Sequence, residues 1–423
     1  MLRLGDTVWH NHFDLAVRGA CSWNSQAVSS ESSRQGCDVP NGDKNFIGEF
    51  GMNKKLVTIA VAGALAAPAL ALAQTASVSI YGLLNAEYGF ARQPDNAVGV
   101  GRHSVDSLGS GASRFGFRGE EKLSGGTSAW FQCESDFRFL SGSTRTSGSI
   151  CDRNSALGLK GGFGNFFVGT WDTPIKTAVG KVRMLNETGW TGAQHLLLNG
   201  NAGGQAISLS NRNSDSVNYE TPNFSGFQGR VQITSTKAAE NIASTNNNVK
   251  GRDFGIGGDY SNGPLLVALG YSRRDDNMSQ IATAGSKDTV WAAGVNYTFG
   301  ALKGGVTYTD TKIANGPANT NGKRKSWNLA LQYTAGVHSI MGGYTLAGDY
   351  KGSSVAVGTE DNGAKQWQIG YNHAMSKRTN VGVTYARLTN DRFGVYNLTP
   401  LSQTNTFADQ NASVFNLYMN HTF

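Results

Sequence analysis

The sequence predicts an all-β protein, a sixteen-stranded antiparallel transmembrane β-barrel with short turns on one side of the membrane and long loops on the other. Three observations lead to this fold class. Segments of alternating apolar and polar residues recur along the chain, short and long connections follow one another between these segments, and Ser413–Phe423 alternates to the last residue. A terminal strand frays unless it is held, and closing a barrel pairs the last strand with the first.

Residues 52–73 have the pattern of a secretory signal peptide. A basic start, Met52–Lys55, precedes an Ala-rich and Leu-rich run, and Ala71–Ala73 fits an A-x-A cleavage site. We therefore expect residues 74–423 to be the exported barrel. Because such signals stand at the N-terminus, residues 1–51 are anomalous. Our hypothesis is that translation starts at Met52 and that residues 1–51 reflect a misplaced start assignment.

Composition narrows the class of protein. Residues 74–423 contain no run of 18 apolar residues, which excludes a helical membrane protein. Low overall hydropathy is compatible with a barrel, because the residues that face its lumen are polar. The formal net charge is +7, but no basic stripe or nucleic-acid motif accompanies it, so we expect no nucleic-acid partner.

The clearest predicted strands come late in the chain. Apolar residues occupy every second position in Trp291–Phe299, Trp327–Tyr333, Trp367–Tyr371 and Val381–Tyr385. A period of two is the strand signature. Trp and Tyr at the ends of these apolar faces suit a lipid interface, where the ring lies in hydrocarbon and the polar edge among headgroups.

The connections fall into two length classes. Seven short turns are expected at 122–126, 161–164, 222–226, 261–264, 299–301, 334–336 and 375–378. Eight long loops are expected near 91–112, 139–150, 172–212, 237–251, 273–287, 310–325, 346–363 and 389–411. Fifteen connections join sixteen strands, and short periplasmic turns with long external loops are typical of bacterial outer-membrane barrels.

The third long loop, about 172–212, is too long to be a simple connection. It carries apolar stretches such as His195–Leu198, which would be poorly placed in solvent. We expect this loop to fold into the lumen and narrow the pore. An exposed lid is the competing interpretation.

Two cysteines remain in the exported part. Cys133 and Cys151 are an even number in an exported chain, and both are in phase with apolar neighbours on either side of an expected loop. We expect a disulfide between adjacent strands. The alternative is two free thiols facing outward.

Selectivity of a channel comes from charges that line a narrow polar lumen. Alternation places Phe115 and Phe117 toward lipid and Arg114 and Arg118 inward, and the same argument turns Arg230 inward. A charge on the lipid face at the midplane would cost about 2–4 kcal/mol. The inserted loop adds further candidates, positive at Lys176, Lys181 and Arg183 and negative at Asp172 and Glu187. The alternative is that several of these charges form salt bridges at the rim, away from the permeation path.

The motifs Ser77–Gly82, Ser113–Glu121, Leu157–Gly164 and Ser216–Gly226 resemble the general porins of β-proteobacteria and Neisseria, and the resemblance covers nearly all of 74–423. It implies a sixteen-stranded homotrimeric diffusion channel with its third external loop folded inward. It also implies contact with outer-membrane lipid and lipopolysaccharide, and folding by the barrel assembly machinery with Phe423 as the signal. Cys133 replaces a more usual aliphatic residue, and a basic residue is absent beside Phe423.

We therefore expect passive, weakly anion-selective diffusion of ions and small hydrophilic solutes across a Gram-negative outer membrane. A substrate-specific outer-membrane channel is the closest alternative, and a secreted all-β adhesin is a further one. The sequence has no H-E-x-x-H, C-x-x-C or P-loop motif, and its histidines are scattered. We expect no catalytic residue, no metal and no cofactor.

Overall fold

The structure is a computed structural model of the 423-residue chain. It describes residues 77–93, 103–111, 113–140, 150–183, 196–197, 199–202, 205–208, 212–234, 237–238, 250–275, 287–316, 320–352, 360–396, 398 and 409–423. The predicted signal peptide, residues 52–73, and the anomalous residues 1–51 lie outside these ranges, so their assignment stays a prediction.

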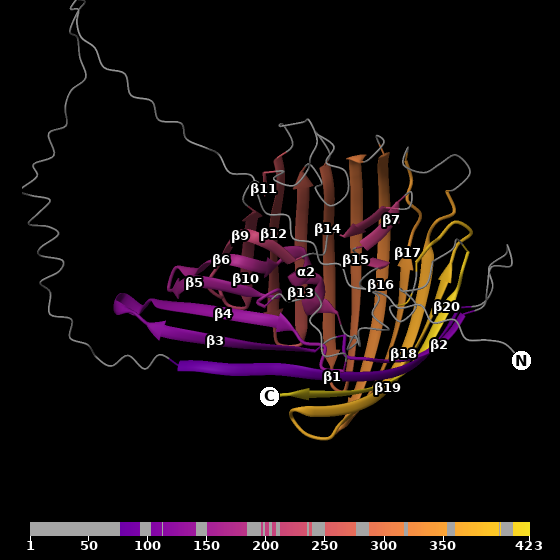
Figure 1. The fold of residues 1–423 in the computed structure, drawn as a ribbon, viewed down its shortest axis with the longest axis horizontal. Helices are drawn as coiled ribbons and strands as arrows, with labels where there is room; N and C mark the ends of the chain where they lie inside the picture. The colour runs from indigo at the N-terminus through magenta and orange to yellow at the C-terminus, as the bar shows by residue number, and fades with distance from the viewer. Residues whose placement is uncertain are drawn as a thin grey trace, which may run out of the picture. The chain divides into compact units, whose positions relative to one another are not determined.

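Sixteen antiparallel strands form a closed barrel, as the sequence predicted (Figure 1). They are β1 (Ser77–Gln93), β3 (Arg114–Lys122), β4 (Ser128–Asp136), β5 (Ser155–Gly161), β6 (Gly164–Asp172), β9 (Arg212–Glu220), β10 (Phe227–Thr234), β12 (Lys250–Asn262), β13 (Leu265–Asp275), β14 (Lys287–Phe299), β15 (Leu302–Gly316), β16 (Thr320–Ala335), β17 (His338–Ala347), β18 (Ala364–Ala374), β19 (Thr379–Asn390) and β20 (Ala412–Thr422). Two further short strands pair with barrel strands. They are β2 (His103–Gly109), which pairs with β1, and β11 (Lys237–Ala238), which pairs with β12.

The barrel closes by pairing its first and last strands. Leu83 to Arg92 of β1 pair with Thr422 to Ser413 of β20, and the start of β1 pairs with β3. The backbones of Phe423 and Gly82 exchange two hydrogen bonds, at 3.1 and 3.2 Å. A Cβ on Gly82 would lie 2.3 Å from the Phe423 ring, so this glycine leaves the space in which the terminal ring packs. The chain end is therefore held as predicted.

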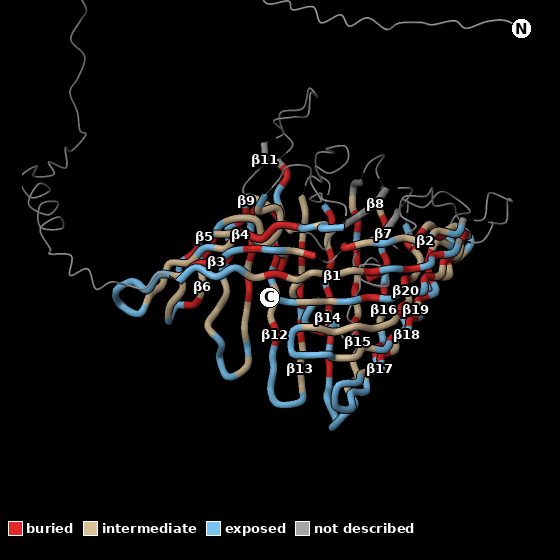
Figure 2. The backbone as a smooth tube through the Cα atoms, turned by 60° about the horizontal axis from the view of Figure 1, so that its bottom comes forward, coloured by how far each residue is buried: buried red, intermediate tan, exposed pale blue. Residues whose placement is uncertain are grey.

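Burial alternates along the strands, as Figure 2 shows by colour. In the middle of β14, β18 and β20, outward residues such as Trp291, Ile369 and Leu417 are exposed and apolar, while the inward residues next to them are buried. Trp291, Trp327 and Trp367 are 44%, 50% and 43% exposed on the outer face. These rings therefore take the lipid-facing positions that the alternation predicted. None of the described helices is long and apolar enough to span a membrane.

The seven predicted turns all connect neighbouring strands, and the one at 122–126 contains the 3₁₀ turn η1 (Ser124–Gly126). One predicted long loop is wrong. Residues 310–325 are mostly strand, because β15 and β16 stay paired as far as Gly316 and Thr320. Polar alternating residues such as Asp310–Lys312 continue a ladder that extends past the apolar band, and the sequence pattern did not distinguish them from loop.

Candidate functional site

The third long loop enters the barrel, as predicted. Its helix α2 (Pro174–Val182) lies against the inner face of β12, β13 and β14 (Figure 1). Glycines clear this stretch of wall: a Cβ on Gly270 would lie 2.7 Å from the Ile175 Cα, and one on Gly294 would lie 2.4 Å from the Val182 side chain. The apolar residues of α2 are buried there. We call its described part, residues 173–183, 196–197, 199–202 and 205–208, the inserted loop.

Local sequence explains why α2 begins where it does. Thr173 is the N-cap residue, and its hydroxyl accepts a hydrogen bond from the Lys176 backbone N–H at 3.4 Å. Pro174 follows at the first helical position, where its missing N–H is not needed. Beyond the helix the loop also contains the hairpin β7 (Asn199–Ala202) and β8 (Gln205–Ser208).

The first charged group of the lumen surrounds Asp172, at the junction of β6 and the inserted loop. Its carboxylate lies 2.7 Å from the Lys176 ammonium and 3.0 Å from the Arg212 guanidinium. The Asn154 side-chain amide donates to it at 3.2 Å, and Arg212 donates to the Asn154 side-chain oxygen, Oδ1, at 2.7 Å. Of these residues, Asp172 and Lys176 were predicted and Arg212 was not.

The second group surrounds Glu134 on β4. The Arg153 guanidinium lies 2.7 Å from this carboxylate, and that of Arg114 lies 3.8 Å away. The Tyr81 hydroxyl donates to Glu134 at 3.2 Å. Arg153 precedes Asn154 in the chain, so the groups around Glu134 and Asp172 are contiguous. We call the four cations and two carboxylates the charged cluster: Arg114, Arg153, Lys176, Arg212, Glu134 and Asp172.

Cations outnumber carboxylates in the charged cluster. Its six side chains carry four positive and two negative formal charges, and each carboxylate has two basic partners. The Arg114 and Lys176 side chains are 37% and 25% exposed, so part of this charge faces the lumen. A water-filled lumen with a cationic wall attracts anions and repels cations.

Other predicted cations lie in a separate ion-pair network. Arg230 is inward as expected, but it is only 8% exposed and pairs with Asp259 and with Glu220. Lys181 of α2 reaches the same Asp259 at 2.7 Å. These two charges therefore hold α2 against β10 and β12, and Arg230 offers little open charge to a passing ion.

The remaining predicted positions differ in environment. Arg118 is exposed on the inner face of β3 and has no carboxylate partner among the described residues. Arg183 is an exposed residue at the end of α2. Glu187 lies outside the described residues. That these charges control permeation stays a prediction.

Cys133 and Cys151 form a disulfide in the structure, with Cα atoms 4.8 Å apart. The bond joins β4 to the segment that leads into β5. Cys151 has a φ of 60°, and its backbone N–H donates to the Ser135 hydroxyl at 2.9 Å. The geometry supports the predicted bridge between neighbouring strands.

A second loop also enters the barrel, which sequence reasoning missed. Tyr396 and Leu398, from the loop after β19, are buried beside Leu196 of the inserted loop. Alanines supply the space on the inner faces of the surrounding strands; they are Ala91, Ala347, Ala364, Ala386 and Ala412. The sequence signal for this second inward loop was the run of small residues at inward positions of consecutive strands.

Arg324 of β16 connects the two inward loops. It is 1% exposed, and its guanidinium donates to the Tyr396 hydroxyl and to the Leu197 carbonyl, the latter at 3.5 Å. The guanidinium also lies 4.9 Å from the centre of the Tyr350 ring. Burial raises the pKa of Tyr350 to about 12, so this phenol is neutral at physiological pH. Thr309 donates to the same Leu197 carbonyl at 2.7 Å.

Three carboxylates gather at the loop end of the barrel. One carboxylate oxygen from each of Asp349, Asp361 and Asp391 lies within 4.8 Å of the other two. Asp349 accepts hydrogen bonds from the backbone N–H groups of Asn362 and Gly363. Burial raises the pKa of Asp391, the neighbouring carboxylates add to the rise, and the Lys365 ammonium, 3.7 Å away, opposes it.

Comparison with known protein families identifies one match. The model that describes Gram-negative porins matches residues 58–392. That range covers most of the barrel, from before β1 to just after β19.

Individual relatives agree with the family match. The chain is 29% identical to outer membrane porin protein 32 of Delftia acidovorans over 331 residues, which cover 78% of this chain and 87% of that protein. It is 26% identical to an outer membrane porin protein of Bordetella pertussis over 372 residues, covering 77% and 92%. It is 25% identical to the major outer membrane protein P.IB of Neisseria lactamica over 340 residues, covering 79% and 92%.

Solved structures share the fold. An anion-selective porin from Comamonas acidovorans superposes with a TM-score of 0.66 at 24% identity, covering 82% of this chain and all of that one. The outer membrane protein OmpT of Vibrio cholerae, in its in-vitro folded form, superposes with a TM-score of 0.58 at 18% identity, covering 82% and 98%. At these identities the likeness establishes the barrel architecture.

Proposed function

Because the chain belongs to the Gram-negative porin family, a family of channels rather than enzymes, we propose that it is a general porin of the outer membrane with a weak preference for anions. Ions and small hydrophilic solutes diffuse passively through its water-filled lumen. The observation that carries the preference is the charged cluster, in which four cations surround two carboxylates beside the inserted loop.

The physical argument concerns the excess of positive over negative groups in the charged cluster. Arg153 and Lys176 lie 2.7 Å from Glu134 and Asp172, and Arg114 and Arg212 add a second cation beside each carboxylate. The Debye length is about 8 Å at physiological ionic strength, so the excess acts on ions that pass close to this wall. Screening keeps the preference weak, because ions near the opposite wall do not feel it. The name of the Comamonas relative, an anion-selective porin, agrees with this proposal.

The assembly and export of the protein form part of the proposal. We infer a homotrimer in contact with outer-membrane lipid and lipopolysaccharide; one of the related OmpT structures is a trimer form. We also infer export by the signal peptide 52–73, translation from Met52, and recognition of Phe423 by the barrel assembly machinery. N-terminal sequencing of the membrane-extracted protein tests the cleavage of the signal peptide. A start at Gln74 is expected, and any residue before it contradicts the cleavage.

Selectivity is tested with three variants in planar bilayers under a KCl gradient. We expect Arg153→Gln to reduce the chloride preference and Glu134→Gln to increase it, because each removes one charge from the same ion pair. Lys377→Gln is the matched control, since this exposed lysine lies in the turn between β18 and β19, away from the cluster. Equal reversal potentials for all three variants would contradict the proposal.

A further inference from the structure

The inner wall carries a group of large aromatic side chains that a polar diffusion channel does not require. Trp130 of β4 packs against Phe167 and Trp171 of β6, with ring centroids 5.3 and 5.9 Å away, and Phe167 and Trp171 are 4.8 Å apart. We call these three residues the aromatic cluster. Phe167 is 1% exposed, while both tryptophans keep accessible surface on a water-filled lumen. Aromatic surface turned toward water is a candidate binding surface.

The backbone is shaped to accommodate this cluster. A Cβ on Gly158 would lie 2.6 Å from the Phe167 Cβ and 2.7 Å from the Trp130 indole nitrogen, so only glycine leaves the space. The pairing of β6 with β9 shifts register between Gly169 and Trp171, and Gly169 has a φ of 150°. The extra residue of this irregularity lies on β9, because Ser216 and Asn213 are three positions apart while Gly169 and Trp171 are two, so Trp171 stays on the same face of β6 as the buried Phe167.

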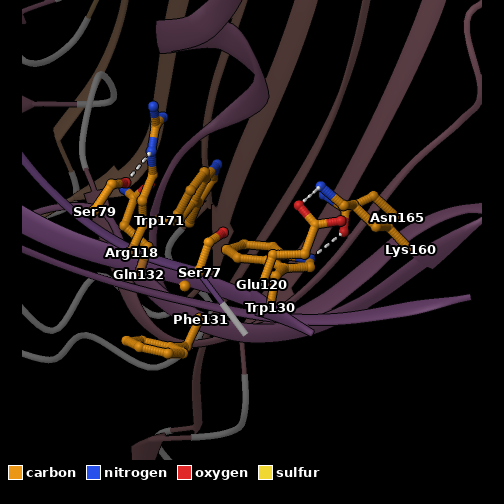
Figure 3. Close-up of a pocket in the computed structure, with 11 residues that line it drawn as sticks. Ser77, Ser79, Arg118, Glu120, Trp130, Phe131, Gln132, Lys160, Asn165 and Trp171 are labelled. Atoms are coloured by element: carbon orange, nitrogen blue, oxygen red, sulfur yellow. Dashed lines mark hydrogen bonds and ion pairs between the residues drawn. The ribbon is translucent and has the colours of Figure 1, made fainter. Parts of the chain in front are cut away.

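The tryptophans line a recess of about 490 Å³ in the wall (Figure 3). Its other linings come from β1, β3, β4, β5 and β6, and include Ser79, Arg118, Gln132 and Lys160. Figure 3 shows Phe131 pointing away from these groups, as expected for a lipid-facing neighbour of Trp130. Recesses of about 300–1,000 Å³ are the usual size for binding one small molecule.

Charge and hydrogen bonding indicate what the recess would bind. Lys160 and Glu120 form an ion pair at 2.7 Å, so their charges cancel. Arg118 contacts the Ser79 hydroxyl at 3.4 Å and lies 5.2 Å from the centre of the Tyr81 ring, but no described carboxylate pairs with it. The recess therefore has one uncompensated positive charge beside aromatic surface.

The indole N–H groups refine this assignment. The Trp130 indole N–H donates to the Asn165 side-chain oxygen, Oδ1, at 2.7 Å, so it already has a partner. The Trp171 N–H has no hydrogen-bond partner among the described residues. The donors on Trp171 and Arg118 suit an anion, because the guanidinium is charged and binds a carboxylate through charge-assisted hydrogen bonds.

We propose that this recess binds a planar aromatic monocarboxylate as it passes through the pore. The Arg118 guanidinium holds the carboxylate, and the aromatic cluster packs on the ring. This inference rests on the proposed function, because the solute reaches the recess only through an open channel. It adds a solute class for which the porin has a weak affinity.

Current blockade in planar bilayers tests the inference. Benzoate is added on the side of the short turns, and acetate and cyclohexanecarboxylate serve as anions without an aromatic ring. We expect benzoate to interrupt the chloride current at about tenfold lower concentration than either comparator, the size of effect that an aromatic contact supplies. Trp171→Leu and Arg118→Gln should each raise the benzoate concentration required by about tenfold.

Trp327→Leu is the matched control, since this tryptophan lies on the outer face and should leave blockade unchanged. Heat-modifiable migration on gels establishes that each variant is folded. Equal blockade by the three anions would overturn the inference, as would an unchanged benzoate response in folded Trp171→Leu and Arg118→Gln. If the channel still prefers chloride in that case, the proposed function stands. Selective benzoate blockade in a channel without chloride preference supports the recess and contradicts only the proposed selectivity.

Discussion

The packing of α2 against a glycine-lined wall predicts how a substitution in that wall changes conductance and stability. In Gly270→Ala the new Cβ would lie 2.7 Å from the Ile175 Cα, a backbone atom that cannot rotate away. Carbon atoms pack at roughly 3.5–4.0 Å, so the helix must move into the lumen by about 1 Å. Overpacking of this kind costs about 1–3 kcal/mol. We therefore expect a smaller single-channel conductance and a lower unfolding temperature.

The control for this variant lies in the same helix. A Cβ on Gly180 meets no heavy atom within 4 Å, so Gly180→Ala should leave the position of α2 unchanged. Replacing a helical glycine with alanine stabilises a helix by roughly 0.5–1 kcal/mol. Conductance in planar bilayers and heat-modifiable gel migration are measured for both. If Gly270→Ala conducts and unfolds like the native protein, α2 does not rest on this wall.

Three further predictions concern other parts of the barrel. Cys133→Ser with Cys151→Ser should lower the free energy of unfolding by about 3 kcal/mol, since the bridge closes a loop of 18 residues; a reductant should have the same effect on the native protein and none on the variant. Arg324→Met should increase open-channel current noise, because the inserted loop and the loop of Tyr396 lose a shared hydrogen-bond donor. Lys325→Met, at the exposed neighbouring residue, should not increase it. Equal noise in both variants would show that Arg324 does not hold these loops. Asp391→Asn should raise the unfolding temperature at neutral pH. A raised pKa in the folded state means that ionised Asp391 disfavours folding, so the native protein gains stability as the pH falls through that pKa and the advantage of Asp391→Asn should shrink; an advantage that does not change with pH would contradict this.

Much of the barrel could be predicted because strand alternation and turn composition are local signals. The seven turns, the outward tryptophans and the inward parity of Arg114 and Arg118 all follow from residues within a few positions of one another. The error at 310–325 has a local cause too, since a strand that continues beyond the lipid loses its apolar face while its backbone pairing continues.

The charged cluster could be predicted only in part. Parity places Arg114 inside, but Arg212 meets Asp172 through the pairing of β9 with β6, and Arg153 reaches Glu134 from the segment before β5; neither contact is a local signal. Arg230 is buried in an ion-pair network in which Asp259 also pairs with Lys181 of α2, a contact between segments far apart in the chain. The inward position of Trp171 follows from alternation with the buried Phe167, but its contact with Trp130 joins residues far apart in the chain, which alternation alone does not predict.

The zero-current potential of the purified native protein in a planar bilayer, under a KCl gradient, tests the cationic wall most directly. We expect discrete ohmic steps whose reversal potential shifts toward that of chloride, and the shift should decrease as the salt concentration rises, because added ions screen the Arg114 and Arg212 charges. Steps with a reversal potential that favours potassium would contradict the role given to the charged cluster and leave a porin with a different selectivity.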